Sequence, residues 1–494
     1  QTTDTTDLME EMAAPPLAEA TSALRNILSR APKRFANAEA LSALENGWKS
    51  VYSNEGNDLN FASLDDRKSL CAGITRVLAV LPPEQWAVSL TTLTNPTIEC
   101  IEIMLKSISE NQISEDKSKL DERVTRISEE ICVFASAIRT FHAAAKKQAK
   151  VPLLSLLHRV WPLVAHIAKT LSTQEVIISS LCEFLLIVIS LNDDGKDVGL
   201  LKEASEIAIA ILDFASNEHT QCHVMPIMEF VEQMIETFGH LAEAQVNAIS
   251  SSPVAIGLTQ QMRDIVEDLL RKAFHVIQGQ SQKENVDALP GLFLVCGACI
   301  RRCPCLFFSL NIAVESAESL CTASLNAARS SVTSKQIDVV RSTLLYLNEA
   351  FILTSTAVAT DAQNNRNGAA IKCIEAVNPY RAELVTTLIH GSCGVFPREA
   401  LDPVGTLLHS ILKTTPIAEA ENICTQALQA ETFRLGDEAK RAALSVLGKT
   451  VQNTIAPSVV MDLLDDLWTL HQNDEVGVMV AGGDTILSFT ERYG

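Results

Sequence analysis

The chain of 494 residues has few aromatic side chains, few basic residues and no long apolar run. These three shortages argue against an aromatic core, direct nucleic-acid binding and a membrane span. Aromatic residues make up 5% of a sequence that is 47% hydrophobic, so aliphatic side chains must fill most of the core. Sixty acidic residues against 40 basic ones give a formal net charge of −20, which argues against direct nucleic-acid binding because phosphates need cations. The longest apolar runs, Phe184–Ile189 and Leu292–Ile300, are far below the ~20 residues of a membrane span, which predicts no membrane insertion.

Strand-like alternation is missing as well, whereas apolar residues recur at helical spacing from Pro15 to Arg492. Short turn signals such as Pro82-Pro83 and Asn192-Asp-Asp-Gly195 separate the helical stretches. We therefore expect helices near 17–30, 39–53, 63–80, 84–108, 118–148, 152–170, 173–191, 197–215, 219–242, 257–279, 284–301, 304–328, 333–359, 366–390, 397–413, 417–431, 434–452, 456–471 and 474–490.

These helices pair into units close to the ~40–47 residues of HEAT-type repeats. The predicted fold is an all-α HEAT-repeat α-solenoid, a right-handed superhelix of antiparallel helix pairs. Residues 1–16, rich in Thr, Asp and Glu, are expected to be a disordered or loop lead-in, and residues 17–494 one continuous solenoid. The helix at 17–30 is apolar on one face with no preceding repeat to cover it, which indicates a piece of a longer solenoid.

Thirteen cysteines lie mostly within apolar helical stretches, as reduced cysteines do in a cytosolic or nuclear protein. The densest group comprises Cys296, Cys299, Cys303 and Cys305. A zinc site would need four converging ligands, and this group has no neighbouring histidine and begins inside an apolar helix. Buried thiols are the favoured interpretation, and zinc the minor one.

No pattern in the sequence supports catalysis, a cofactor or a metal. His158 and His166, like His219 and His223, have helical spacing but no carboxylate at ligand spacing. The turn Gly391-Ser-Cys-Gly394 follows no strand, and Ala481-Gly-Gly-Asp484 lacks the Lys-Ser/Thr of a phosphate loop. We expect a binding protein that is not an enzyme.

Two acidic groups are candidate contacts for a basic partner, which a negative surface would attract over long range. One lies at a helix–helix turn and the other on a single helix; they comprise Asp193, Asp194 and Asp197, and Asp462, Asp465 and Asp466. A solvated helix face, or acidic residues favoured at a helix N-terminus, would explain the same residues without a partner.

Several segments together resemble the C-terminal half of nuclear transport receptors of the importin-β superfamily, the karyopherins. Within it, the chain is most similar to the branch of transportin-SR and importin thirteen. The segment Leu70–Pro83 resembles a helix of that branch that ends in a Leu-Pro turn. Val160-Trp-Pro-Leu163 resembles the family's Trp-Pro helix start, and Gln174–Cys182 follows at a matching distance. Arg302–Phe308 resembles the family's Lys/Arg-x-Pro-x-Leu-Phe segment, and Ala18–Leu28 the second helix of an upstream repeat.

This resemblance implies a HEAT superhelix that binds protein cargo and shuttles between cytoplasm and nucleus, with nucleoporins as further possible partners. It also implies release by Ran-GTP, which the family grips chiefly through N-terminal repeats that this chain lacks. The two acidic groups then become candidate cargo-binding residues. The transportin-SR helix that reads phosphorylated Arg-Ser cargo is rich in arginine, and this chain has none at the corresponding positions, which are Val176, Ser180, Glu183, Leu186 and Ser190. Basic or folded cargo is therefore expected.

Two other interpretations of tandem helix pairs stay open. A HEAT or armadillo array can serve as an interaction scaffold, or as the regulatory subunit of an enzyme, with no link to Ran.

Overall fold

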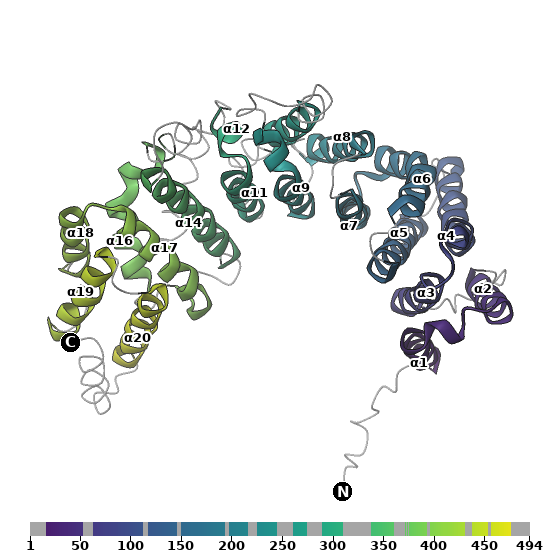
Figure 1. Cartoon of the computed structure of the whole chain (residues 1–494), viewed down its shortest axis with the longest axis horizontal. Helices are drawn as coiled ribbons and strands as arrows, with labels where there is room; N and C mark the ends of the chain where they lie inside the picture. Colours follow the sequence, from purple (N-terminus) through teal and green to yellow (C-terminus); the bar gives the residue numbers. More distant parts are fainter. Residues whose placement is uncertain are drawn as a thin grey trace, which may run out of the picture. The chain divides into compact units, whose positions relative to one another are not determined.

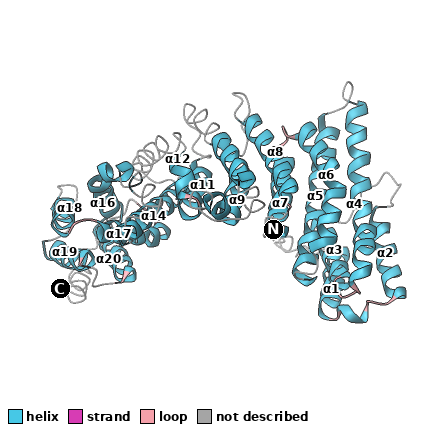
Figure 2. Ribbon diagram, turned by 45° about the horizontal axis from the view of Figure 1, so that its top comes forward, coloured by secondary structure: helices cyan, strands magenta, loops and turns pink. Residues whose placement is uncertain are grey.

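Helices make up the architecture, as the apolar periodicity predicts (Figures 1 and 2). The computed structural model describes residues 16–52, 63–111, 117–145, 150–192, 197–215, 225–244, 260–273, 289–309, 337–359, 371, 373, 375–392, 396–429, 437–452 and 456–475. These residues form α-helices and short 3₁₀ helices, with no strand among them. The all-α helical-repeat prediction is confirmed. The chain divides into two compact units, Gln1–Phe214 and Ala215–Gly494.

The first unit arranges its helices in two rows that face each other. One row consists of α1, α3, α5 and α7, and the other of α2, α4 and α6 (Figure 1). The helices are α1 (Pro16–Arg30), η1 (Pro32–Arg34), α2 (Ala38–Tyr52), α3 (Leu64–Leu78), α4 (Pro83–Asn111), α5 (Lys117–Ala145), α6 (Lys150–Leu171), α7 (Glu175–Leu191) and α8 (Val198–Ala215).

Local sequence signals explain where these helices begin. Ser63 caps α3 with its side chain, which accepts from the backbone N–H of Asp66, while Asp66 accepts from the N–H of Ser63 in return. Asn37 caps α2 through the N–H of Ala40. Pro83 opens α4, where its missing N–H costs nothing. The predicted boundaries are therefore close to the observed ones.

Two prolines lie inside helices instead of at their starts. Pro162 is in the second half of α6, as the predicted helix 152–170 has it; the Trp-Pro pair that resembles a helix start of the family does not begin a helix here, because α6 begins at Lys150. Pro96 lies in the middle of α4. A helical proline deprives the carbonyl four residues earlier of its donor and disturbs the next one. Beside that point in α4, the indole N–H of Trp48 donates to the carbonyl of Leu93 at 2.7 Å.

The core between the two rows is mainly aliphatic, as the low aromatic content predicts. The few aromatic side chains lie where helices of both rows meet. Trp86 of α4 packs edge-on against Phe141 of α5, with ring centroids 5.4 Å apart. Trp161 of α6 and Phe134 of α5 both lie against Phe184 of α7. The α6 and α7 helices are thus fixed to α5 through one buried ring.

The second unit again has a row of helices that each pack against the next, in the order α9, α11, α14, α17 and α20. A second layer holds α16, α18 and α19, with α18 between the other two (Figure 1). The helices are α9 (Met225–Ala244), α11 (Leu289–Arg302), α12 (Pro304–Ser309), α14 (Ile337–Ala359), η4 (Asn378–Tyr380), α16 (Arg381–His390), η6 (Arg398–Ala400), α17 (Leu401–Thr414), α18 (Ile417–Gln429), α19 (Asp437–Val451) and α20 (Pro457–Glu475), with a further helical segment at 260–273.

Polar contacts connect neighbouring helices of this row. Arg301 of α11 donates from Nε to Glu236 of α9 at 2.7 Å and from Nη1 to Glu349 of α14 at 3.2 Å. Burial alone would raise the pKa of Glu236, but hydrogen bonds from Arg302 and Arg301 outweigh it and lower that pKa. Glu243 of α9 accepts the backbone N–H groups of Cys305 and Leu306, in the first turn of α12. These contacts hold three successive helices in register.

Some expectations differ from the structure. Within the predicted helix 366–390, a 3₁₀ turn at η4 interrupts the helix because Pro379 lacks the N–H that would continue it. The successive helices α3, α5 and α7 begin farther apart than the expected repeat of ~40–47 residues, because α4 and α5 are 29 residues long each. The lead-in at residues 1–15 and the helix expected at 474–490, except Asp474 and Glu475, lie outside the described residues.

Candidate interaction surfaces

Of the first acidic group, Asp197 is among the described residues, whereas Asp193 and Asp194 lie outside them. Asp197 precedes α8 and accepts the backbone N–H of Leu200 at 3.1 Å, as an N-cap residue does. Its other carboxylate oxygen is 2.7 Å from Nε2 of His158 on α6. Asn192, directly after α7, makes two hydrogen bonds with the backbone of Asp197: its side-chain amide donates to the carbonyl and accepts from the N–H. The Asp197 carboxylate therefore caps α8 and connects it to α6.

The second acidic group lies on α20, in the second unit. Asp465 forms a two-pronged ion pair with Arg398, with distances of 2.8 and 2.9 Å. Arg398 also lies 5.8 Å from the ring centroid of Trp468, whose indole N–H donates to the carbonyl of Phe396. Asp462 is exposed and Asp466 is half-buried.

The α7 positions that correspond to the arginine-rich helix do not form one open face. Val176 is 45% exposed, whereas Ser180 is buried in the core at 2%. Glu183 is partly exposed and pairs with Arg139 of α5 at 3.1 Å. An anionic partner at this face of α7 would meet a carboxylate and no arginine of α7.

The motifs that we considered for chemistry have ordinary places in the fold. Cys296, Cys299 and Cys303 are reduced and fully buried, and burial raises the pKa of the first two thiols well above the usual value. Cys305, also reduced and half-buried, completes that group. Among the described residues, no group of three potential ligands could hold a metal ion. Ser392 is buried, follows the end of α16 and donates to the carbonyl of Leu388 in that helix. His219, His223 and the segment 481–484 lie outside the described residues.

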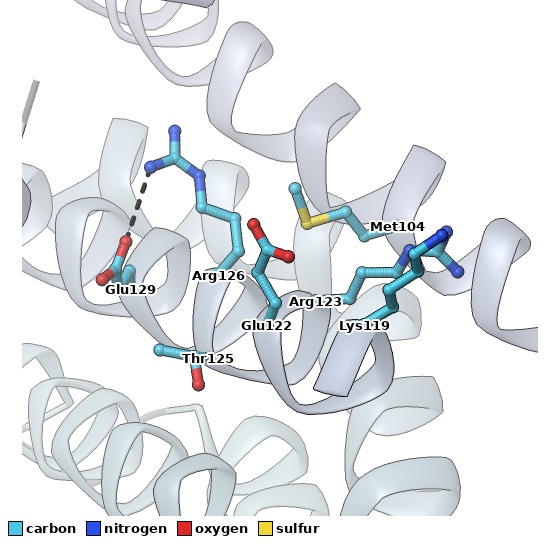
Figure 3. A pocket seen from close by; sticks show the side chains of 7 residues that line it. All are labelled: Met104, Lys119, Glu122, Arg123, Thr125, Arg126 and Glu129. Atoms are coloured by element: carbon cyan, nitrogen blue, oxygen red, sulfur yellow. Dashed lines mark hydrogen bonds and ion pairs between the residues drawn. The ribbon is translucent and has the colours of Figure 1, made fainter. Parts of the chain in front are cut away.

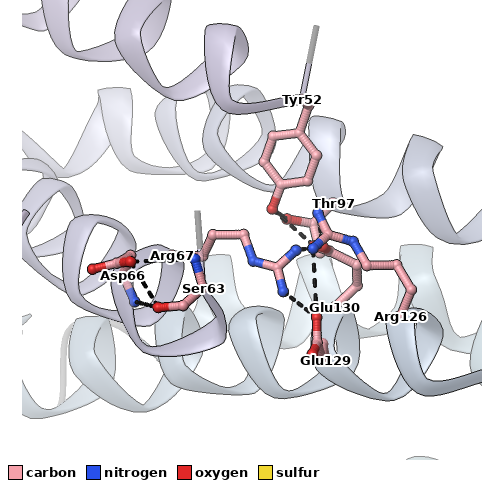
Figure 4. A network of polar contacts seen from close by, with 8 residues as sticks. All are labelled: Tyr52, Ser63, Asp66, Arg67, Thr97, Arg126, Glu129 and Glu130. Carbon is pink, nitrogen blue, oxygen red and sulfur yellow. Dashed lines mark hydrogen bonds and ion pairs between the residues drawn. The ribbon is translucent and has the colours of Figure 1, made fainter. Parts of the chain in front are cut away.

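A buried ionic network in the first unit was not anticipated from the sequence (Figure 4). Its centre is Glu130 of α5, whose side chain is fully buried. The fully buried Arg67 of α3 donates to Glu130 at 2.8 Å and also pairs with Glu129. Arg126 lies 2.9 Å from Glu130, and the Tyr52 hydroxyl of α2 donates to it at 2.8 Å. Helices of both rows are therefore connected through one carboxylate.

The network extends to the remaining helices at this end of the unit. The Tyr52 hydroxyl is also within 3.0 Å of Thr97 on α4. The neighbour of Arg67, Asp66, accepts from the Thr21 hydroxyl of α1 at 2.7 Å. Burial raises the pKa of Asp66, but hydrogen bonds from Ser63 and Thr21 outweigh it, so the net pKa is lowered. A chain of polar contacts thus joins α1 to α5.

Burial dominates the electrostatics of Glu130. It raises the pKa of this carboxyl to about 7, more than Arg67 and Tyr52 lower it. Burial and the nearby Glu130 charge likewise raise the pKa of Tyr52 far above its ordinary value. The carboxyl therefore titrates near neutral pH in the folded state, whereas an unfolded glutamate titrates near 4.5.

We expect this group to make the first unit less stable as the pH rises from about 4.5 to about 7. In that interval the folded state keeps the Glu130 proton and the unfolded state has lost it, so a rise in pH favours unfolding. Urea denaturation at pH 5 and pH 7.5 would measure the difference in the wild type and in Glu130→Gln. The glutamine variant, which cannot titrate, should show a smaller loss between the two pH values. An equal loss in both proteins would show that Glu130 does not titrate in this interval.

A hollow beside the network lies between α4 and α5 (Figure 3). It has a volume of about 650 Å³. Its lining from α5 carries both signs of charge, with the cations Lys119, Arg123 and Arg126 and the carboxylates Glu122 and Glu129, and Met104 of α4 supplies an apolar wall. Mixed charges of this kind satisfy one another and favour no single class of ligand.

One described helix, α6, passes the length and composition test for a membrane span, although no run of that length is purely apolar. In the relevant window, 44% of the residues are buried inside the protein. Its apolar stripe, which includes Leu153, Leu157 and Val164, packs against α4, α5 and α7. A core helix with one buried stripe accounts for this composition.

Comparison with known proteins yields a likeness in structure. No protein-family model matches the sequence, and no curated protein matches it. Among solved structures, "Importin13 cytosolic state" matches with a TM-score of 0.61 and 13% identity, over 93% of this chain and 46% of that one. A "Circular tandem repeat protein with novel repeat topology and enhanced subunit contact surfaces" matches with a TM-score of 0.40 and 10% identity, over 90% of this chain and 98% of that one. This chain thus spans about half the length of the importin 13 chain, and over that length the two share a helical-repeat fold.

Proposed function

We propose that this chain is part of a nuclear transport receptor that binds protein cargo, with loading and release governed by Ran-GTP in the full-length protein. The observation that carries the proposal is the likeness to importin 13 over 93% of this chain. The order of the segments that resemble the transportin-SR and importin thirteen branch supports it. On this proposal the chain is the C-terminal portion of the receptor, shuttles between cytoplasm and nucleus, and is not an enzyme.

The packing of the helices suggests how such a receptor would work. Each helix of a row packs mainly against the next, so small rotations between repeats can add along the chain. Cargo and Ran-GTP would then favour different arrangements, and the difference in their binding free energies would couple loading to release. We propose basic or folded cargo. Of the acidic candidates on α20, Asp462 is the one we assign to cargo contact, because Asp465 is held by Arg398.

The proposal predicts that the full-length protein binds Ran in a nucleotide-dependent way. Purified full-length protein should bind Ran loaded with a non-hydrolysable GTP analogue at least ~10-fold more tightly than Ran-GDP. Proteins that it captures from a cell extract should be released by the former and retained with the latter. Surface plasmon resonance and elution from the immobilised protein would measure the two effects. This chain alone should bind Ran-GTP more weakly, because we place the main grip in upstream repeats.

Equal binding of the two nucleotide forms by the full-length protein, with no release of captured proteins, would contradict the proposal. A repeat scaffold or regulatory subunit with no Ran link would then be the better assignment.

A further inference from the structure

A second hollow in the first unit carries an excess of positive charge, unusual in a chain with a net charge of −20. It lies where α1, α3 and α5 meet and has a volume of about 370 Å³; we call it the α1–α3–α5 hollow. Its cations are Arg25 of α1 and Lys68 and Arg76 of α3. One carboxylate, that of Asp65, also lines it, so the hollow has a formal charge of +2.

The ion pairs of the described residues leave these three cations out. Within the described part of the chain, none of the three forms an ion pair with a carboxylate at 4.0 Å or less. Arg76 donates to the hydroxyl of Ser29, which leaves its charge uncompensated. By contrast, the cations of the α4–α5 hollow lie beside acidic residues of their own helix.

Three hydroxyl groups complete the lining: Ser69, Ser136 and Thr140. Elsewhere in these helices such hydroxyls donate back to the helix carbonyl, as Thr75 does to Cys71 at 2.6 Å. The three hydroxyls of the hollow make no such bond to any residue that the structure describes. They are half-buried and remain available to a ligand.

The packing of α1 on α3 places Arg25 beside this hollow. A Cβ atom at Gly73 would lie 3.2 Å from the Cα atom of Arg25 and 3.1 Å from Cδ1 of Leu28. The missing side chain at Gly73 therefore lets α1 approach α3 closely. The small Ala72 lines the hollow on the same turn.

We propose that the α1–α3–α5 hollow binds a phosphoryl group. A phosphate monoester carries about −1.5 to −2 charges at neutral pH and three terminal acceptor oxygens, which match the charge and the donors of the hollow. A carboxylate has one charge and two oxygens, so it would leave both charge and donors unmatched. The volume exceeds that of a phosphoryl group and leaves room for the molecule that carries it. The inference is independent of the proposed transport function.

Isothermal titration calorimetry with inorganic phosphate and with a phosphoserine pentapeptide would test this binding. The unphosphorylated peptide is the control, and none of its binding is expected. Tighter binding of the phosphopeptide than of inorganic phosphate identifies a phosphorylated protein as the source, and equal binding identifies a small soluble phosphate. Failure of both probes to bind would overturn the proposal.

Variants of the lining residues give opposite expected effects. The double variant Arg25→Ala/Lys68→Ala should bind the better probe at least ~10-fold more weakly, since each charge-assisted bond contributes about 1.5–3 kcal/mol. Asp65→Asn, which removes the competing carboxylate, should bind it ~3–10-fold more tightly. Arg30→Ala, an exposed arginine of α1 outside the lining, should leave binding unchanged. Thermal unfolding of each variant confirms that it is folded. A loss with Arg30→Ala equal to that of the double variant would show general attraction to the surface and overturn the site.

Discussion

Replacing Glu130 with methionine is expected to lower the free energy of unfolding of the first unit by about 3–5 kcal/mol. The change removes the acceptor that Arg67, Arg126 and Tyr52 share. The loss is largest for Arg67, because its side chain is fully buried, a guanidinium cannot lose its proton near neutral pH, and among the described residues only the partly exposed Glu129 remains to pair with it. Urea denaturation followed by tryptophan fluorescence would measure the loss, since Trp48, Trp86 and Trp161 all lie in this unit.

A double-mutant cycle distinguishes a stranded charge from a simple loss of packing. Arg67→Met should cost less than Glu130→Met, because the carboxyl that remains can take up a proton. The double variant Arg67→Met/Glu130→Met should be more stable than Glu130→Met alone, since it also removes a buried cation that has lost its fully buried partner. Glu110→Met, which changes an exposed pair with Lys106, should cost less than about 1 kcal/mol. Additive losses in the double variant would contradict this account of the network.

Most of the helical architecture can be predicted from local signals. The capping pair of Ser63 and Asp66, the cap at Asn37 and the opening Pro83 act within a few residues, so the sequence contains the whole interaction. Two prolines lie inside the predicted helices 84–108 and 152–170 and inside the observed ones as well. Pro162 and Pro96 lie within helices, where tertiary packing of the apolar faces outweighs the lost hydrogen bond.

The sequence hints at the buried ionic network but does not determine its pairing. Arg67 occupies the same apolar helical face as Leu64, Cys71 and Ile74, and Glu130 lies on the face of Ile127 and Phe134. A charged residue on the apolar face of a helix is buried with that face, and a buried charge needs a partner of opposite charge. The two residues are 63 positions apart, however, and which charge meets which depends on how α3 packs against α5. The α1–α3–α5 hollow could not be predicted for the same reason, because its lining residues come from three helices and meet only when those helices pack.

The acidic candidates were easy to find in the sequence, but the sequence did not show whether their carboxylates are available to a partner. As sequence, Asp197 and Asp465 look like free negative charges on helix termini and faces. In the fold, His158 and Arg398 reach them from distant positions in the chain and occupy their carboxylates. A cluster of acidic residues predicts a negative surface, whereas the availability of each carboxylate depends on contacts between helices.

Replacing Gly405 with alanine is expected to destabilise the second unit by about 1–3 kcal/mol, even though alanine is the better helix former. Gly405 lies in α17 against α20, and an added Cβ atom would be 2.7 Å from Cγ, 3.1 Å from Cα and 3.3 Å from N of Met461. The side-chain atom can move, but the two backbone atoms belong to α20 and can separate only if the helices do. Close packing of the α17–α20 pair therefore depends on the missing side chain.

Gly448→Ala is the matched control, because this helical glycine of α19 has no atom within 4 Å of its added Cβ. It should stabilise the unit by about 0.5–1 kcal/mol through helix propensity alone. Fluorescence of Trp468, on α20 itself, reports both changes during urea denaturation. Adding Met461→Ala to Gly405→Ala should restore part of the loss, since it removes Cγ and leaves the backbone contacts. If both glycine variants were stabilising, α17 and α20 could not be as close as the contact at Met461 requires, and the spacing of this row would have to be set by its larger side chains.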